Sequence, residues 1–255
     1  MKSTNGATRR RIGMLIPSSN TVVESVASAI LAEVPGVSAH MSRLPVLEIS
    51  LANNSQLQFR SEPMLGAADL LADARVQVMG WNGTSASWLG FEHDRHLCEM
   101  MTERYGIPTT TAVLAVNELL QELAVRRIAL VTPYIDSVQA DIVSHYRNAG
   151  YDCAAERHIG EHVNYAFAEI DDNEIVRMIR EVATHRPSAI VVMCTNMRAA
   201  HLIDALEREI DIPIIDSLAA FVWKSLRLIG IETAQIAGWG RIFQCVGAAP
   251  SCARR

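Results

Sequence analysis

One cysteine of the sequence stands where it could take part in catalysis. Cys194 follows an unbroken apolar run, residues 189–193, which is typical of a buried parallel strand. Thr195, Asn196 and a helix-like segment that extends to Glu209 come next. Open α/β sheets bind ligands at the carboxyl ends of their strands. We therefore interpret Cys194 as a candidate nucleophile or proton donor, with a buried structural cysteine as the alternative.

A thiol at the beginning of a helix is expected to have a depressed pKa. The sequence accordingly predicts that Cys194 is alkylated faster than the other four cysteines. These four are irregularly spaced and are interpreted as incidental. They are Cys98, Cys153, Cys245 and Cys252.

Polar residues that could hold an anion follow other predicted strands. Hydroxyl groups and free backbone N–H groups at such strand ends favour a negatively charged ligand. The alternatives are ordinary helix capping, a turn glycine, loop-forming asparagines and a packed tyrosine. The candidate binding residues are Pro17, Ser18, Asn20, Gly83, Thr84, Ser85, Tyr134, Asn164 and Thr195, with Asp216 and Ser217 as further cleft candidates.

The elements that position these residues repeat along the chain. Segment 12–18 corresponds to 128–134, segment 78–84 to 189–195, and segment 107–109 to 212–214. This internal duplication aligns Gly83 with Cys194. Alternating strands and helices predict an α/β protein of two pseudo-symmetric, Rossmann-like halves. Each half is expected to be a parallel sheet flanked by helices, with the active site in the cleft between the halves.

The predicted organisation assigns every part of the chain. Residues 1–10 form a disordered N-terminal tail, and residues 246–255 form a C-terminal tail. The first half comprises residues 11–123 and about 220–245, and the second half comprises residues 124–219. Residues 45–58 are a loop or lid candidate.

Composition excludes several classes of function. The net charge is −5 and no Lys/Arg run is present, so we expect no nucleic-acid partner. No apolar stretch reaches the ~18 residues of a membrane span, and no signal peptide is apparent, so we expect no membrane partner. The cysteines show no disulfide framework or metal spacing, which predicts a cytoplasmic protein without a bound metal. Neither GxGxxG nor a P-loop occurs, so no nucleotide cofactor is expected.

The strand ends around Pro17, Thr132 and Cys194, with their order along the chain, resemble those of the aspartate/glutamate racemase superfamily. The resemblance extends from about residue 11 to residue 244. It is greatest to the branch of arylmalonate decarboxylases and maleate cis-trans isomerases. It implies a cofactor-free enzyme with one cysteine position in each half and the substrate between them. A homo-oligomer is possible.

Within that branch, the chain resembles the decarboxylases because Gly83, Thr84 and Ser85 occupy the first cysteine position. The resemblance implies that the Gly-Thr-Ser loop and Tyr134 hold a carboxylate while Cys194 protonates the carbanion. A racemase needs an acid and a base on opposite faces, whereas a decarboxylase needs only one proton donor. We therefore expect a single-cysteine decarboxylase of a 2-substituted malonate or a similar small dicarboxylate.

Two other functions remain open from the sequence. Asn20 and Asn164 resemble the asparagines that hold substrate carboxylates in maleate isomerases, so an isomerase of a small unsaturated dicarboxylate is the first alternative. Thr195-Asn196 also departs from the Gly-Gly-type continuation of the decarboxylases. The second alternative is a non-catalytic accessory protein that binds a small acid.

Overall fold

The computed structural model describes residues 9–52 and 57–244. The predicted terminal tails therefore lie almost entirely outside the described residues, as do Cys245 and Cys252. Strand β1 begins at Arg10, inside the tail expected for residues 1–10.

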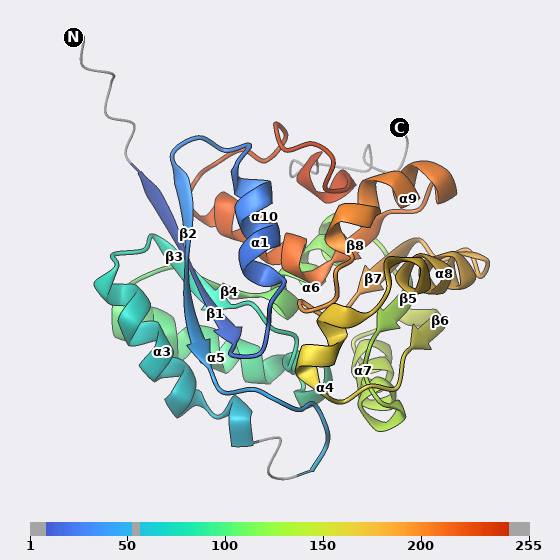
Figure 1. The fold of residues 1–255 in the computed structure, drawn as a ribbon, viewed down its shortest axis with the longest axis horizontal. Helices are drawn as coiled ribbons and strands as arrows, with labels where there is room; N and C mark the ends of the chain where they lie inside the picture. Colours follow the sequence, from blue (N-terminus) through green and yellow to red (C-terminus); the bar gives the residue numbers. More distant parts are fainter. Residues whose placement is uncertain (1–8, 53–56, 245–255) are drawn as a thin grey trace.

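The first half is a four-stranded parallel sheet with the strand order β2-β1-β3-β4. Helices cover both of its faces (Figure 1). Its strands are β1 (Arg10–Pro17), β2 (Val37–Leu44), β3 (Val78–Trp81) and β4 (Thr109–Thr111). Its helices are α1 (Val23–Leu31), α3 (Ser61–Asp73), α4 (Ala86–Leu89), α5 (Phe91–Tyr105) and α6 (Ala112–Glu122), with a short 3-10 turn at Leu57–Phe59.

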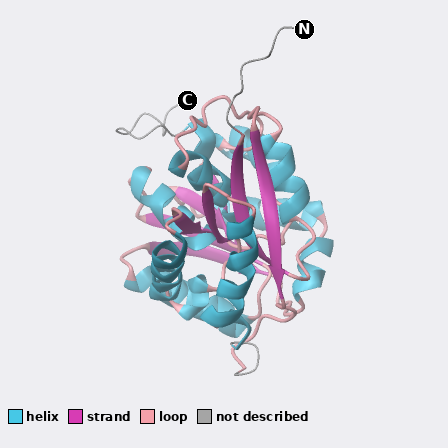
Figure 2. Ribbon diagram, turned by 90° about the vertical axis from the view of Figure 1, so that its left-hand side faces the viewer, coloured by secondary structure: helices cyan, strands magenta, loops and turns pink. Residues whose placement is uncertain are grey.

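The second half repeats this topology, with the strand order β6-β5-β7-β8 and all strands parallel. Figure 2 shows the strands of one sheet upright and those of the other running across them. The strands are β5 (Arg127–Thr132), β6 (Asp152–His158), β7 (Ala189–Val192) and β8 (Ile214–Asp216). The helices are α7 (Asp136–Asn148), α8 (Asp172–Ala183) and α9 (Ile203–Ile210), and 3-10 turns span Asn164–Glu169 and Ala200–Leu202.

The two halves are α/β units of the predicted kind because their sequences alternate between two patterns. All four residues of β7 are buried and apolar, as expected for a central parallel strand. Helix α8 instead buries only a stripe at helical spacing, and the Asp171 side chain accepts from the backbone N–H of Asn173 at its start. That stripe consists of Ile175, Met178, Ile179 and Val182.

The chain crosses between the halves through α10 (Ser217–Leu228). This helix follows β8 directly and packs against α1 and α6 of the first half (Figure 1). The boundary expected between residues 219 and 220 therefore falls inside a continuous helix. A final 3-10 turn, Arg241–Gln244, packs against α10 and β8.

Two helical regions are interrupted. The region that follows Ser85 is divided into α4 and α5 at Gly90, which has a φ of 99°. The helix predicted directly after Cys194 does not start there. Residues 195–199 form turns, and α9 begins only at Ile203.

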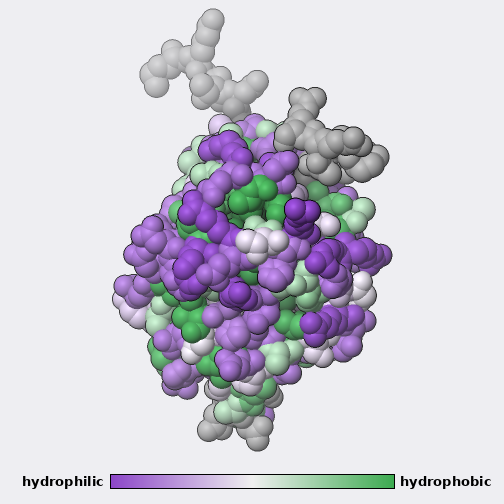
Figure 3. Space-filling view, turned by 90° about the vertical axis from the view of Figure 1, so that its right-hand side faces the viewer, coloured by the Kyte–Doolittle hydropathy of each residue, from purple (hydrophilic) through white to green (hydrophobic). Residues whose placement is uncertain are grey.

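The surface over the second half is mostly hydrophilic, with smaller apolar areas between the polar ones (Figure 3). The core of this half takes the side chains of β7 and β8 and most of those of β5, whereas no residue of β6 is fully buried. Within residues 9–52 and 57–244, no helix is long and apolar enough to cross a membrane.

Candidate functional site

Cys194 lies two residues beyond the end of β7 and is only 2% exposed. Burial raises the pKa of its thiol to about 12. Hydrogen bonding from the Tyr134 hydroxyl and from the backbone N–H groups of Asn196 and Met197 opposes this rise, and the charge of Asp216 adds to it. The depressed pKa expected from the sequence is therefore wrong. Desolvation outweighs the local donors, and no helix begins at the thiol.

Three hydroxyl groups from the two halves line the same cavity as Cys194. Thr84 and Ser85 follow β3 in the first half, and Tyr134 follows β5 in the second. Thr84 Oγ1 and Tyr134 Oη are 2.6 Å apart. Burial raises the pKa of Tyr134 well above 10, as does the neighbouring Cys194, so this phenol remains a hydrogen-bond donor.

Thr195 joins the strand ends of the two halves. Its Oγ1 donates to the carbonyl of Asn82 at 3.1 Å and accepts from Asn20 Nδ2 at 3.3 Å. Asn20 Oδ1 also accepts from the backbone N–H groups that begin α1, at 2.9 and 3.0 Å. Asn20 does not line the cavity, so its amide supports Thr195 and the first turn of α1 instead.

A second set of hydrogen bonds between polar side chains connects the two halves beside the cavity. Asn196 Nδ2 donates to the carbonyl of Asn164 at 2.6 Å, and its Oδ1 accepts from the backbone N–H of Thr21 at 3.0 Å. Asn164 Nδ2 donates to Ser19 Oγ at 2.7 Å. The candidate Ser18 is exposed and does not line the cavity. The chain turns after β1, and this turn directs Ser19 toward the second half.

Much of the rest of the cavity wall is apolar, and no charged side chain lines the cavity in the described part of the chain. The cavity has a volume of only about 20 Å³, which is enough for about one water molecule. The small dicarboxylate expected from the sequence is larger than this space. The apolar wall consists of Pro17, Val46, Ile49, Phe59, Trp81 and Trp88.

Gly83 occupies the place in the first half that Cys194 occupies in the second, and both line the cavity. A Cβ atom on Gly83 would lie 2.4 Å from the indole ring of Trp81. This ring is 1% exposed, and its Nε1 donates to Ser85 Oγ at 3.0 Å. The glycine is thus required by a neighbouring side chain, since its φ is not positive.

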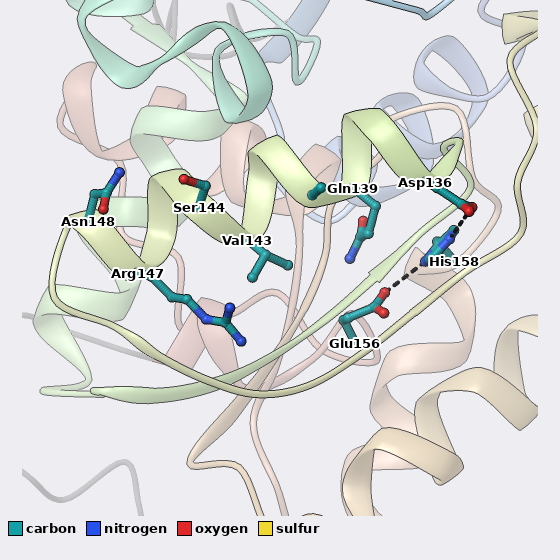
Figure 4. Close-up of a pocket in the computed structure, with 9 residues that line it drawn as sticks. Asp136, Gln139, Val143, Ser144, Arg147, Asn148, Glu156 and His158 are labelled. Atoms are coloured by element: carbon teal, nitrogen blue, oxygen red, sulfur yellow. Dashed lines mark hydrogen bonds and ion pairs between the residues drawn. The ribbon is translucent and has the colours of Figure 1, made fainter.

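A roomier hollow lies elsewhere, on the outer surface between α7 and β6 (Figure 4). This hollow has a volume of about 460 Å³, and most of its lining residues are charged or polar. His158 pairs there with Glu156 at 2.8 Å and with Asp136 at 2.9 Å. Burial lowers the pKa of His158, but the hydrogen bonds and the negative charges of Glu156 and Asp136 together raise it by more. None of the sequence-predicted site residues lines this hollow, so the candidate active site is the small cavity at Cys194.

Comparison with known proteins identifies the family of the chain. The family model for arylmalonate decarboxylase matches residues 12–243. The chain belongs to the arylmalonate decarboxylase family. A maleate isomerase of Nocardia farcinica is 26% identical over 92% of this chain and 96% of its own. An arylmalonate decarboxylase of Bordetella bronchiseptica is 25% identical over 91% of this chain and 95% of its own.

Solved structures of the family share the fold. A Nocardia farcinica maleate cis-trans isomerase mutant superimposes with a TM-score of 0.85 at 24% identity, over 92% of this chain and 98% of that one. The family is therefore one of enzymes that includes both decarboxylases and isomerases. No group of three or more His, Cys, Asp or Glu side chains within residues 9–52 and 57–244 could hold a metal ion.

Sequence reasoning missed the aromatic part of the site. Trp81 and Trp88 are buried, and both also line the cavity. Trp88 Nε1 is buried without a hydrogen-bond partner in the described structure, so it is available as a donor. Phe59 was not singled out, although its ring contacts those of Trp81 and Trp88 edge-on, at centroid distances of 6.4 and 5.7 Å. The only signal was that Trp81 and Trp88 flank the Gly83-Thr84-Ser85 loop.

Proposed function

We propose that this protein is a cofactor-independent decarboxylase of a 2-substituted malonate or a similar small dicarboxylate, with Cys194 as the proton donor. The observation that carries the proposal is a buried thiol, whose pKa of about 12 keeps it protonated, in a cavity where the corresponding residue of the other half is a glycine. A proton donor must hold its proton when the carbanion forms.

The proposed reaction divides the cavity into two sides. The retained carboxylate accepts hydrogen bonds from the hydroxyl groups of Thr84, Ser85 and Tyr134. These donors stabilise the enediolate as charge moves onto that carboxylate, and losing one comparable donor costs about 3 kcal/mol. The departing carboxylate faces the apolar wall, where a charge is poorly solvated and becomes neutral CO2 on leaving.

Each bond and proton of the step is accounted for. The bond between the α-carbon and the departing carboxyl carbon breaks, and its electron pair stays on the α-carbon as the enediolate. The proton of Cys194 Sγ then forms the new C–H bond. Water returns a proton to the thiolate before the next turnover.

Isomerisation of a small cis-unsaturated dicarboxylate is the second candidate, favoured by relatives that are named maleate isomerase. A mechanism in which the thiolate adds to a double bond first requires Cys194 to ionise. Burial raises the pKa of Cys194 to about 12 and so disfavours the thiolate. This raised pKa, together with the glycine at position 83 of the same cavity, is why we place decarboxylation first.

The test is incubation of the wild type and Cys194→Ala with phenylmalonate, methylmalonate, maleate and aspartate. Mass spectrometry follows loss of CO2, and proton NMR follows fumarate. We expect a malonate to lose CO2 with the wild type, and at least ~1000-fold slower with Cys194→Ala, within the range for one acid or base group.

Each other outcome identifies an alternative. Fumarate from maleate without CO2 loss from any malonate would replace the decarboxylase with the isomerase. Thermal-shift binding of these acids without turnover would indicate an accessory binding protein. A Cys194→Ala variant that keeps a tenth of the activity would contradict both enzymatic proposals.

A further inference from the structure

The strand ends of the two halves show an exchange of large and small residues. In the second half, Val192 ends β7 and Cys194 follows two residues later. In the first half, Trp81 ends β3 and Gly83 follows two residues later. The half whose strand ends in the smaller residue, Val192, carries the thiol. The half whose strand ends in Trp81 has a glycine at the corresponding position.

The position of the indole explains this exchange. An added Cβ on Gly83 would lie 2.4 Å from Trp81 Cε2 and Cζ2, and 2.9 Å from Nε1. Real side chains do not approach this closely, so the indole fills the space in which any side chain at position 83 would begin. Both residues line the same cavity as Cys194.

Trp81 is also held in place by the first sheet. It ends a central strand and is paired with Leu15 of β1 on one side and with Thr111 of β4 on the other. Its Nε1–H donates to Ser85 Oγ, so the Ser85 hydroxyl hydrogen remains available to a ligand. Val46, Ile49 and Phe59 lie instead in the connection between β2 and α3.

We propose that Trp81 determines the stereochemistry and the substrate size of this site. Its indole occupies the place of a second acid or base, so protons reach the α-carbon only from the Cys194 face. The same ring forms the fixed wall against which the α-substituent packs, and its hydrogen bond aims Ser85 at the retained carboxylate. This inference rests on the proposed function for its catalytic part.

The steric part is tested without any substrate. Gly83→Ala adds only the Cβ that meets the indole, and overpacking of this kind should lower the melting temperature by roughly 3–10 °C. The same substitution in a Trp81→Val background should have little effect. Gly66→Ala is the matched control, because Gly66 lies in α3 with no atom within 4 Å of an added Cβ. It should leave the melting temperature unchanged or raise it.

The stereochemical part uses Trp81→Val/Gly83→Cys, which gives the first half the Val-x-Cys pattern of residues 192–194. Racemisation of (R)- and (S)-2-phenylpropanoate is followed in D2O by chiral chromatography. We expect the double variant to racemise both acids roughly 100-fold faster than either single variant or the wild type, the gain of one added base. Deuterium exchange with retention in the wild type would agree with a single acting face.

The size limit is tested by comparing phenylmalonate with methylmalonate. Trp81→Val should raise the preference for phenylmalonate at least ~10-fold in kcat/KM. Thermal shifts with the same two malonates give the preference in binding even if neither is decarboxylated, which separates this inference from the proposed function. Trp81→Phe, which keeps an aromatic ring but loses the donor to Ser85, should lower kcat more than it raises KM.

Three results would overturn the inference. One is a Gly83→Ala variant as stable as the wild type. Another is racemisation by Gly83→Cys alone at the rate of the double variant. The third is an unchanged size preference in Trp81→Val, both in turnover and in binding.

Discussion

The hydroxyl oxygens of Thr84 and Tyr134 lie 2.6 Å apart, one from each half of the molecule. The Tyr134 ring is held edge-on between Trp88 and Phe167, at centroid distances of 5.2 and 5.4 Å. Both hydroxyls line the cavity beside Cys194. This hydrogen bond therefore joins the two halves at the proposed binding site for the retained carboxylate.

Removing the Tyr134 hydroxyl should reduce the rate while leaving the fold intact. Tyr134→Phe keeps the ring contacts but loses a donor to the retained carboxylate. We expect kcat/KM to fall about 100- to 1000-fold, as for loss of one oxyanion donor. The measurement is steady-state decarboxylation together with a melting curve. Thr84→Ser, which keeps a hydroxyl, is the control and should stay within about tenfold of the wild type. Equal losses in both variants would mean that packing, and not hydrogen bonding, is responsible.

Cys194 should be alkylated slowly, contrary to the expectation from sequence. Its pKa of about 12 leaves little thiolate near neutral pH, and its side chain is buried. Cys153 is half-buried with a pKa raised to about 11, mainly by burial, and should react before Cys194. Peptide mapping after limited treatment with iodoacetamide at pH 8 gives the order. Label on Cys194 ahead of Cys153 would show that the thiol is accessible and ionised.

The elements and most of the candidate site could be predicted because they depend on local patterns. The apolar run before Cys194 predicts a strand, and the internal duplication predicts that the loop at Gly83 lies near the end of that strand. Both predictions depend only on spacing and on the parallel order of strands. Eight of the named candidates line the cavity for that reason: Pro17, Gly83, Thr84, Ser85, Tyr134, Asn164, Cys194 and Thr195.

The remaining features depend on packing between distant segments. The raised pKa of Cys194 arises from burial by both halves, which no local pattern records. The turn after β1 directs Ser19, and not Ser18, toward Asn164. The indole of Trp81 lies where a side chain at position 83 would begin, and its orientation depends on packing in the surrounding core. The sequence therefore shows the glycine at position 83 but not the steric reason for it.

Asp216 is a buried carboxyl group close enough to Cys194 to affect its pKa. It pairs in register with Val192, and its Oδ1 accepts from the N–H of Ala219 at the start of α10. Its Oδ2 has no hydrogen-bond partner in the described structure. Burial therefore raises the pKa of Asp216 from 3.8 to about 7, against the backbone hydrogen bonds from Ala219 and Leu218.

The raised pKa of Asp216 determines how the stability of the fold changes with pH. The folded state holds the proton more tightly than the unfolded chain does, so this group's contribution to stability is fully present below pH 3.8. It is lost as the pH rises through about 7. Asp216→Asn keeps the acceptor for the Ala219 N–H and cannot ionise. Between pH 4 and pH 8, the free energy of unfolding of the variant should therefore rise relative to that of the wild type, by at most about 4 kcal/mol.

The same substitution should make Cys194 more reactive, because it removes a negative charge that raises the thiol pKa. Urea unfolding at pH 4, 6 and 8 measures the first effect, and the rate of iodoacetamide labelling from pH 7 to pH 10 measures the second. Glu207→Gln is the control. Burial also raises the pKa of Glu207 to about 7, but this carboxylate binds the backbone N–H groups of Ile214 and Arg241. It should alter the pH dependence of stability without changing the Cys194 labelling rate. Equal labelling rates in the wild type and Asp216→Asn would mean that Asp216 does not act on the thiol.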